Sequence, residues 1–369
     1  MYLRQNVHEA ALDRMRWLFD EFPEVVVGFS GGKDSTVVFH LALEVAREKG
    51  RLPLTVMFLD QEAEWQATVD QVRYVMDHPD VNPRWYQFPF RLFNATSSSD
   101  HWLECWDPAE EHRWMRPQEP NAITKNVYGT NRFAKLFAAI PRVEYPDTSM
   151  CYVSGVRTEE SPARFVGLTH AATYKGRTWG KVLDRKLGHY TFYPIYDWSY
   201  LDVWKAIHAN GWPYNAVYDA QYRYGVKLLD MRVSNVHHET AVVHLFYMQE
   251  VEPQTYERLT ARISGIDTAG KLAEDFFVTE LPPMFNGWRQ YRDFLLEKLI
   301  VIPEWAENWR KTFAEFDSTY TGHLTEEEIC RPCISSILTN DHEQIKLDNF
   351  RVSPKAYMIR KKLQGREVY

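Results

Sequence analysis

Long apolar runs are missing from this chain of 369 residues. No segment reaches the roughly 18 consecutive apolar residues that a membrane-spanning helix needs. The stretch from Met1 to Trp17 is amphipathic and has no apolar core of the kind that a secretory signal contains. We therefore expect a protein without a membrane segment or signal peptide, located in the cytoplasm.

Cysteine is scarce. The chain has four: Cys105, Cys151, Cys330 and Cys333. Four are too few for a disulfide scaffold in a chain of this length, so we expect free thiols or metal ligands. Cys330 and Cys333 form a CxxC pair, and all four thiolates together would be enough for zinc or an iron–sulfur cluster. The CxxC pair also lies on an apolar stripe with three isoleucines at 329, 334 and 337, at helical spacing. We favour burial over a metal.

Positive charge is not in excess either, because 43 Lys and Arg residues stand against 50 Asp and Glu, a net charge of -7. Nucleic acid would therefore have to be bound by local basic patches. Two exist, at 174–190 and in the tail, and a solvated surface is the interpretation that we favour for the tail. Hydrophobic residues make up 45% and charged residues 25%, which is typical of globular proteins. This composition excludes disordered, collagen-like and coiled-coil proteins.

The first part of the chain has the pattern of a parallel α/β sheet. An apolar run over 24–29 predicts a buried strand, which leads through a glycine loop into a helix over 35–49. A second strand at 54–59 and a helix at 62–76 follow. Further elements of this domain are expected at 149–156, 190–195 and 201–210. We predict a twisted parallel sheet with helices on both faces, a Rossmann-like fold.

The chain divides near residue 235. Residues 1–235 form the predicted nucleotide-binding domain, with an irregular Trp-rich insertion at about 82–121. Residues 236–369 form a mostly helical region. Its predicted helices are 237–250, 253–263, 288–299, 303–315 and 324–338.

The strongest chemical signal is the hexapeptide Ser30-Gly31-Gly32-Lys33-Asp34-Ser35. Two glycines allow backbone N–H groups to approach an anion closely, and the start of the helix adds unpaired donors with partial positive charge. Lys33 adds a full charge, and the hydroxyls of Ser30 and Ser35 can donate to phosphate oxygens. Asp34 would repel phosphate, so we expect it to orient loop donors or a metal-bound water. The alternative is a plain turn with a helix cap.

This hexapeptide resembles the signature of the PP-loop ATP pyrophosphatases, also called adenine nucleotide α-hydrolase-like proteins. Within that superfamily the chain resembles the phosphoadenosine phosphosulfate (PAPS) reductase family from about residue 22 to about residue 235. Three further segments carry the resemblance: Phe58-Leu-Asp60, Gly155-Val-Arg-Thr-Glu-Glu-Ser161, and the region from Tyr193 to Trp204 with 215–225. The resemblance implies a PP-loop (HUP-like) fold and an adenine nucleotide ligand.

More narrowly, the chain resembles the DUF3440 group, PAPS reductase-like proteins described as co-activators of prophage gene expression. Members are often encoded beside a ParB-like protein. The resemblance therefore implies a ParB-like protein partner, and nucleic acid contact is only weakly supported.

Side chains at two strand ends are the further site candidates, because ligands of open α/β sheets lie at the carboxyl ends of strands. Asp60 is predicted to accept from a ribose hydroxyl or to hold Mg²⁺ through water, the alternative being a helix cap. Gly155 stands at another strand end. Arg157 suits a bidentate phosphate or sulfate contact, or an ion pair with a neighbouring glutamate. Ser161 before Pro162 suits a capped turn.

The basic segment 174–190 follows these residues. It contains five cations against one acid, and its glycines indicate a loop. We predict a mobile lid that closes over phosphates, with Lys175 and Arg177 as nucleotide ligands. A plain solvated loop is the alternative.

Three functions compete. The intact hexapeptide favours an enzyme that binds ATP and Mg²⁺, cleaves the α–β phosphoanhydride with Lys33, Asp34, Asp60 and Arg157 as catalytic residues, and adenylylates an unknown acceptor. The second function is a PAPS or adenosine 5′-phosphosulfate (APS) enzyme. The terminal Glu-Cys-Gly-Leu-His-type motif of the reductases is missing, which weighs against reduction. The third is a nucleotide-sensing regulatory protein without turnover.

Overall fold

The computed structural model describes residues 5–97, 100–228, 231–233, 236–237, 245–267 and 280–338, together with 341, 344 and 347. The chain forms two compact units. The first is made of Met1–Leu92, Leu103–Val236 and Tyr247–Arg262, and the second of Phe93–Trp102, His237–Phe246 and Ile263–Tyr369.

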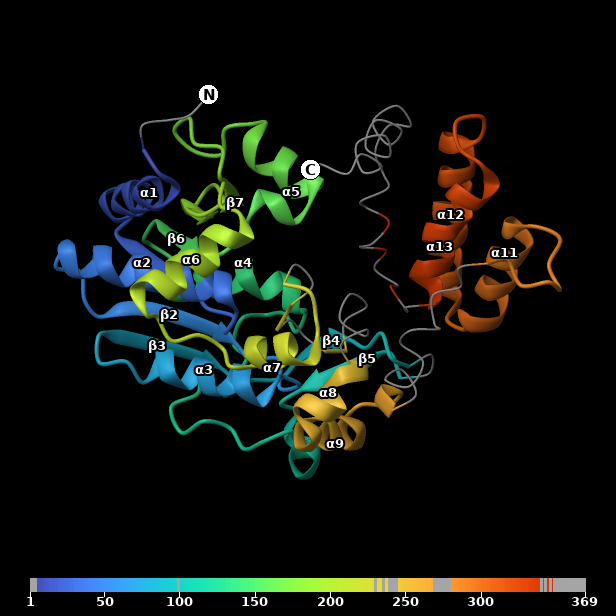
Figure 1. Cartoon of the computed structure of the whole chain (residues 1–369), viewed down its shortest axis with the longest axis horizontal. Coiled ribbons are helices and arrows are strands. Elements are labelled where there is room, and N and C mark those ends of the chain that lie inside the picture. The colour runs from blue at the N-terminus through green and yellow to red at the C-terminus, as the bar shows by residue number, and fades with distance from the viewer. Residues whose placement is uncertain are drawn as a thin grey trace. The chain divides into compact units, whose positions relative to one another are not determined.

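A six-stranded sheet forms the centre of the first unit, in the order β3-β2-β1-β6-β8-β7 (Figure 1). All neighbouring strands pair in parallel except β7, which is antiparallel to β8. The strands are β1 (Glu24–Gly28), β2 (Leu54–Leu59), β3 (Val81–Tyr86), β6 (Met150–Val153), β7 (Gly180–Asp184) and β8 (His189–Phe192). The predicted α/β fold class is confirmed. The chain moves outward from β1 through β2 to β3 and then returns to the other side of β1, so the strand order reverses between β1 and β6.

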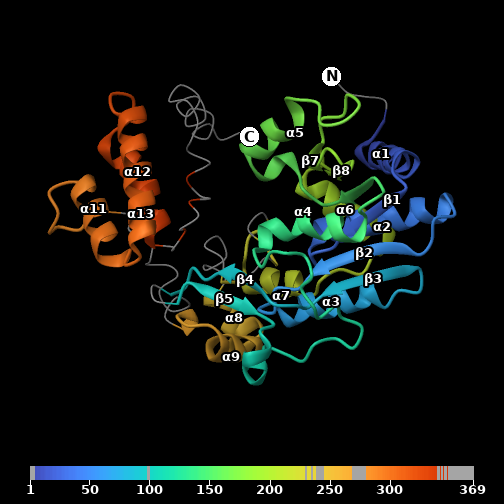
Figure 2. The same cartoon turned by 180° about the vertical axis from the view of Figure 1, so that it is seen from behind.

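Apolar periodicity determines how the helices cover this sheet. The middle residues of β1 are buried on both faces, and α2 contributes a wide buried stripe to the same core. Right-handed crossovers place α2 and α3 on one face and α4 on the other, as the two opposite views show (Figures 1 and 2). The helices of this part are α1 (Val7–Glu21), α2 (Lys33–Glu48), α3 (Gln66–Met76), α4 (Phe133–Glu144), α5 (Pro162–Thr169), α6 (Tyr200–Asn210), α7 (Val217–Tyr224), α8 (Leu245–Val251) and α9 (Pro253–Arg262).

The region predicted as an irregular insertion, 82–121, is more ordered than expected. Its first residues belong to β3, and a two-stranded sheet of β4 (Phe90–Phe93) and β5 (Trp102–Cys105) follows. Pro83 lies inside β3, although proline interrupts most strands. Among the described strands β3 pairs only with β2, and such an edge strand tolerates a proline.

The segment 174–190, predicted as a mobile loop, is only partly a loop. Residues 180–184 and 189–192 form the antiparallel strands β7 and β8 at the end of the sheet. Gly180 contributes to this pairing because a Cβ there would lie 2.7 Å from the ring of Phe192. Two of the glycines that suggested flexibility, Gly176 and Gly188, have positive φ angles and occupy turns.

In the second unit, three helices surround an apolar core that contains both cysteines of the CxxC pair. They are α11 (Trp288–Leu299), α12 (Pro303–Tyr320) and α13 (Glu326–Leu338), close to the predicted spans. Cys330 and Cys333 are fully buried with Trp309 and Phe316, which confirms the predicted apolar stripe. Burial raises the pKa of Cys330 to about 11 and that of Cys333 to about 12. The basic tail from Arg351 onward lies outside the described residues.

The packing does not stop at residue 235. Residues 247–262, with most of α8 and all of α9, belong to the first compact unit. The predicted helix at 253–263 matches α9. Of the predicted span 237–250, residues 245–250 are helical, and 238–244 lie outside the described residues. Among the described helices, none is both long enough and apolar enough to cross a membrane.

Candidate functional site

The glycine loop joins the end of β1 to the start of α2. Gly31 has a φ of 72°, a conformation that favours glycine, and a Cβ there would lie 2.7 Å from the Thr68 methyl group. Ser35 holds the loop closed, because its Oγ accepts from the N–H of Ser30 (3.2 Å) and donates to the carbonyl of Gly32 (2.9 Å). Ser35 therefore has a structural role in this state, whereas Ser30 is exposed.

The start of α2 offers backbone donors to an anion. The N-cap residue of this helix is Gly32, which has no side chain to cap it. The first intrahelical bond runs from the N–H of Thr36 to Gly32 (3.0 Å), and the N–H of Lys33 donates to the hydroxyl of Tyr218 (3.1 Å). Within the described residues, the N–H groups of Asp34 and Ser35 are left as donors at the positive end of the helix dipole.

Three predicted site residues come together in one ion-pair network. The Asp34 carboxylate accepts from Lys33 Nζ (2.9 Å) and from Arg157 Nε (2.6 Å). Arg157 is 4% exposed and also pairs with Glu159 (2.5 Å), which is the predicted ion pair with a neighbouring glutamate. Its contact with phosphate or sulfate stays a prediction. Gly155 makes this approach possible, because a Cβ there would lie 2.7 Å from the Asp34 carbonyl carbon.

Two further arginines near this network were missed in the sequence. Arg164, on α5, pairs with Glu160, and its pKa is lowered by burial and by the nearby charge of Arg232. Ser161 caps the N-terminus of this helix, as predicted, because its Oγ accepts from the N–H of Arg164 (3.2 Å). The position of Arg164, three residues after Ser161 in the same motif, was the available signal. Arg232 gave none.

The segment after α6 contacts the glycine loop through two buried side chains, Asn215 and Tyr218. Asn215 is fully buried, and its Nδ2 donates to the carbonyl of Gly31 (3.1 Å) and to the Thr68 hydroxyl (2.9 Å). Tyr218 lies beside Lys33, whose Nζ is 5.6 Å from the ring centroid. Burial raises the pKa of Tyr218, so it stays a neutral acceptor for the loop.

Asp60 follows β2 at its end, as predicted, but other side chains occupy its carboxylate. It is fully buried at the end of β2, and its carboxylate accepts from Arg116 (2.5 Å), Trp85 Nε1 (2.7 Å) and Gln87 Nε2 (2.8 Å). The N–H of Glu62 adds another donor (2.9 Å). With both oxygens engaged and none open to solvent, these contacts give Asp60 a structural role, and a magnesium or ribose contact would have to displace Arg116.

Two glutamates beside Asp60 have opposite surroundings. Glu62 is fully buried and pairs with Arg262 (2.6 Å). Glu64 is 5% exposed, and no described residue donates a hydrogen bond to its carboxyl. Burial, with a smaller contribution from the charge of Asp60, raises the pKa of Glu64 to about 8.

Lys175 and Arg177, predicted as nucleotide ligands, are bound to α1. Lys175 pairs with Glu21, which also accepts from the hydroxyl of Tyr174 (2.7 Å). The Arg177 guanidinium lies 5.0 Å from the ring centroid of Trp17. The acid and the aromatic ring that contact the two cations come from a helix more than 150 positions earlier in the chain. A role of Lys175 and Arg177 in nucleotide binding stays a prediction.

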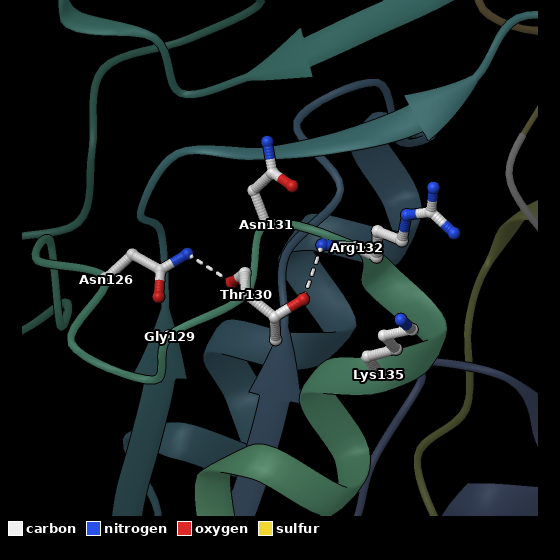
Figure 3. A pocket seen from close by; sticks show the side chains of 6 residues that line it. All are labelled: Asn126, Gly129, Thr130, Asn131, Arg132 and Lys135. Atoms are coloured by element: carbon white, nitrogen blue, oxygen red, sulfur yellow. Dashed lines mark hydrogen bonds between the residues drawn. The ribbon is translucent and has the colours of Figure 1, made fainter.

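A polar cavity of about 480 Å³ lies at the start of α4, apart from the predicted residues (Figure 3). The carbonyl of Thr130 accepts from Asn126 (2.9 Å) and its hydroxyl from the N–H of Arg132 (3.3 Å). The lining includes two cations and no acid. It consists of Asn126, Gly129, Thr130, Asn131, Arg132 and Lys135.

The described residues contain no group of three or more His, Cys, Asp or Glu side chains placed to hold a metal ion. The two cysteines of the first unit, Cys105 and Cys151, are both fully buried, and burial raises the pKa of each. The site is therefore built from backbone donors, Lys33 and arginines.

A family model for the phosphoadenosine phosphosulfate reductase domain matches residues 24–224, more than half of the chain, and the chain belongs to this family. A second model, a domain of unknown function called DUF3440, matches residues 225–356. Both resemblances predicted from the motifs are confirmed. The matched spans meet immediately after α7.

Relatives with similar sequences cover different parts of the chain. The uncharacterized protein YbdN of Escherichia coli (strain K12) is 29% identical over 330 residues, covering 84% of this chain and 79% of the relative. The adenosine 5′-phosphosulfate reductase of Lysinibacillus sphaericus (strain C3-41) is 23% identical over 219 residues, covering 59% of this chain and 78% of the relative. The second match is limited to a smaller part of the chain.

Similar solved structures include a PAPS reductase from Candida auris in a phosphate complex, with a TM-score of 0.34 and 15% identity, covering 62% of this chain and 89% of that chain. The FMN adenylyltransferase of Candida glabrata in complex with ATP has a TM-score of 0.36 and 13% identity, covering 59% of this chain and 61% of that chain.

Gly155→Ala tests the contact between the two strand ends. The added Cβ meets backbone atoms of Asp34 at 2.7 and 2.9 Å, which cannot move without shifting the start of α2. We expect a loss of about 1–3 kcal/mol in the free energy of unfolding, measured by denaturant titration. Gly167→Ala is the control: Gly167 is an exposed glycine of α5 with open space around it, and alanine there should stabilise by about 0.5–1 kcal/mol. Equal effects of the two variants would contradict the close contact.

Glu64→Gln tests the buried carboxyl. Between about pH 4.5 and about pH 8 the folded protein retains a proton on Glu64 that the unfolded chain has released, so wild-type stability falls as pH rises through this window. Glutamine does not ionise. We therefore expect the variant to gain stability relative to wild type across the window, by denaturant titration at both ends. Glu44→Gln, at an exposed position of α2, controls for the lost charge. Parallel pH profiles for wild type and Glu64→Gln would refute the shift.

Proposed function

We propose that the chain binds ATP on the 30–35 loop and cleaves its α–β phosphoanhydride, transferring adenylate to an acceptor and releasing pyrophosphate. One observation carries this proposal: Gly32 gives the helix start no side-chain cap, and the N–H groups of Asp34 and Ser35 have no acceptor among the described residues. That arrangement suits a phosphate chain.

The chemistry requires stabilisation of the leaving group. The acceptor's nucleophilic atom attacks the α-phosphorus, the bond between that phosphorus and the bridging oxygen breaks, and pyrophosphate leaves with the electron pair. Negative charge grows on the β-phosphate during this step. Loop N–H groups and the Lys33 ammonium would stabilise it, and Arg157 would lie over the α-phosphate.

Asp34 pairs with both cations, Lys33 and Arg157, when no ATP is bound. In this structure it neutralises Lys33 and Arg157 together, at 2.9 and 2.6 Å. A triphosphate offers the same cations a stronger anion, so Lys33 would turn from the carboxylate to the phosphates. Asp34 then keeps Arg157 oriented through a charge-assisted hydrogen bond.

Mg²⁺ accompanies ATP in the activity that the resemblance implies, and it would neutralise phosphate charge when bound. The described residues do not fit a protein-held magnesium site, because the Asp60 carboxylate is occupied by Arg116 and no other acid completes a cluster. No step of this proposal depends on a metal held by the chain.

Reduction of PAPS or APS is the second candidate, because the family and a reductase relative suggest it. A reductase needs a thiolate nucleophile beside the sulfate. All four cysteines are fully buried and have raised pKa values, which favours ATP chemistry. A nucleotide sensor without turnover is the third candidate, and a ParB-like partner would then receive its signal.

Calorimetry with ATP, AMP and PAPS tests the loop. We expect ATP to bind more tightly than AMP, because AMP lacks the two phosphates that the loop holds. Lys33→Ala should weaken ATP binding about 10- to 100-fold through the loss of a charged hydrogen bond. Lys175→Ala, which removes a cation bound to Glu21, should leave the affinity unchanged. An affinity that falls with Lys175→Ala and not with Lys33→Ala would place the phosphates elsewhere.

Product analysis tests the reaction. In cell extract supplemented with the protein and ATP labelled in the α-phosphate, we expect AMP or an adenylylated acceptor, together with pyrophosphate, in amounts that depend on Lys33. With PAPS and thioredoxin, no sulfite should appear. ADP and phosphate as the only Lys33-dependent products, or release of sulfite, would contradict the proposal.

A further inference from the structure

The N-terminus of α3 is capped by a carboxylate from a distant part of the chain. Glu252 Oε2 accepts from the N–H of Gln66 (2.7 Å), and its Oε1 accepts from the N–H of Ala67 (3.0 Å). Trp65, the N-cap residue itself, contributes no side-chain cap. Two of the unpaired donors of the first turn, at the positive end of the helix dipole, are therefore satisfied by one acid.

Glu252 is itself held in place. It lies between α8 and α9, where its carbonyl accepts from the N–H of Tyr256 (3.0 Å) in the first turn of α9. The hydroxyl of Thr255, a buried residue, donates to Oε2 (2.7 Å). The carboxylate is thus oriented by its own helix start before it reaches α3.

Two more contacts join the same segment to the connection between β2 and α3. Tyr247, on α8, stacks on Trp65 with 6.1 Å between ring centroids. At the other end, Arg262 of α9 pairs with the buried Glu62 at 2.6 Å. Residues 247–262 therefore clamp the connection at three points, and all three lie within the first compact unit.

The first turn of α3 reaches the glycine loop. Thr68 is fully buried, and its hydroxyl accepts from Asn215 Nδ2, which also donates to the carbonyl of Gly31. The methyl group of Thr68 occupies the space that a Cβ on Gly31 would need. The backbone of the loop and the start of α3 therefore fit each other closely, and a shift of one displaces the other.

We propose that Glu252 is a positioning residue for the nucleotide loop, acting through α3, Thr68 and Asn215. The proposal rests on the proposed function for its ligand. Glu252 falls in the span of the DUF3440 model, 225–356, whereas the loop falls in the reductase-domain span, 24–224. The second family's region thereby sets the geometry of the first family's site.

The physical reason is the cost of an uncapped helix start. Without the carboxylate, the N–H groups of Gln66 and Ala67 lose a charged acceptor, and the first turn of α3 opens more often. Each opening moves Thr68 away from Gly31 and loosens the loop. A looser loop must be ordered when a phosphate chain binds, which lowers affinity.

Three variants test this coupling. Glu252→Ala removes the cap, and Glu252→Gln keeps the length and one acceptor oxygen but not the charge, which guards against simple misfolding. Glu250→Ala is the matched control, because Glu250 is exposed on the same stretch of α8. Hydrogen exchange of the protein without nucleotide is followed at 66–68 and at 31–35, and ATP affinity is measured by calorimetry.

We expect Glu252→Ala to speed exchange in both segments and to weaken ATP binding about tenfold, equal to about 1.4 kcal/mol. Glu252→Gln should have a smaller effect of the same kind, and Glu250→Ala should match wild type. Faster exchange at 66–68 with none at 31–35 would overturn the coupling, as would unchanged ATP affinity. If wild type itself binds no ATP, the proposed function fails, while the exchange experiment still decides the coupling.

Discussion

The carboxylate of Asp34, held between Lys33 and Arg157, is the interaction on which the site depends. It joins the loop after β1 to the loop after β6, the two strands on either side of the point where the strand order reverses. Two cations so close together would repel each other without the acid. The missing side chain of Gly155 allows the approach, so one glycine and one carboxylate determine where the cations stand.

A second buried network, around Asp60, keeps the neighbouring strand end in order. Arg116 pairs with Asp60, and Arg262 pairs with Glu62, so two acids of one short connection are each neutralised by an arginine. Removing one partner from such a buried pair is more costly than the pair's own contribution to stability, because the other charge is left unpaired. These two ion pairs hold the connection between β2 and α3 on one side of the glycine loop. On the other side, Tyr218 and Asn215 hold the loop itself through hydrogen bonds.

The sequence predicted what is local. The 30–35 loop, its strand and its helix follow from adjacent residues, and Gly155 and Arg157 follow from one short motif. The fold class follows from alternating strand and helix patterns, because parallel strands joined by helices leave few arrangements.

The contacts between residues far apart in the sequence were not predicted. Lys175 and Arg177 looked like free cations because Glu21 and Trp17 are far away in the sequence. Asp60 looked open because three of its partners, Trp85, Gln87 and Arg116, come from a stretch interpreted as an insertion. Periodicity indicates that a residue is buried or exposed, but not which residue neutralises it.

A crystal structure with an ATP analogue in which a methylene group replaces the α–β bridging oxygen tests the central claim most directly. The analogue resists cleavage and retains all three phosphates. The account predicts the β- and γ-phosphates on the N–H groups at the start of α2, with Lys33 turned from Asp34 to the phosphates and Arg157 beside the α-phosphate. Phosphates bound in the cavity at Asn126–Lys135, with Lys33 still paired to Asp34, would contradict it.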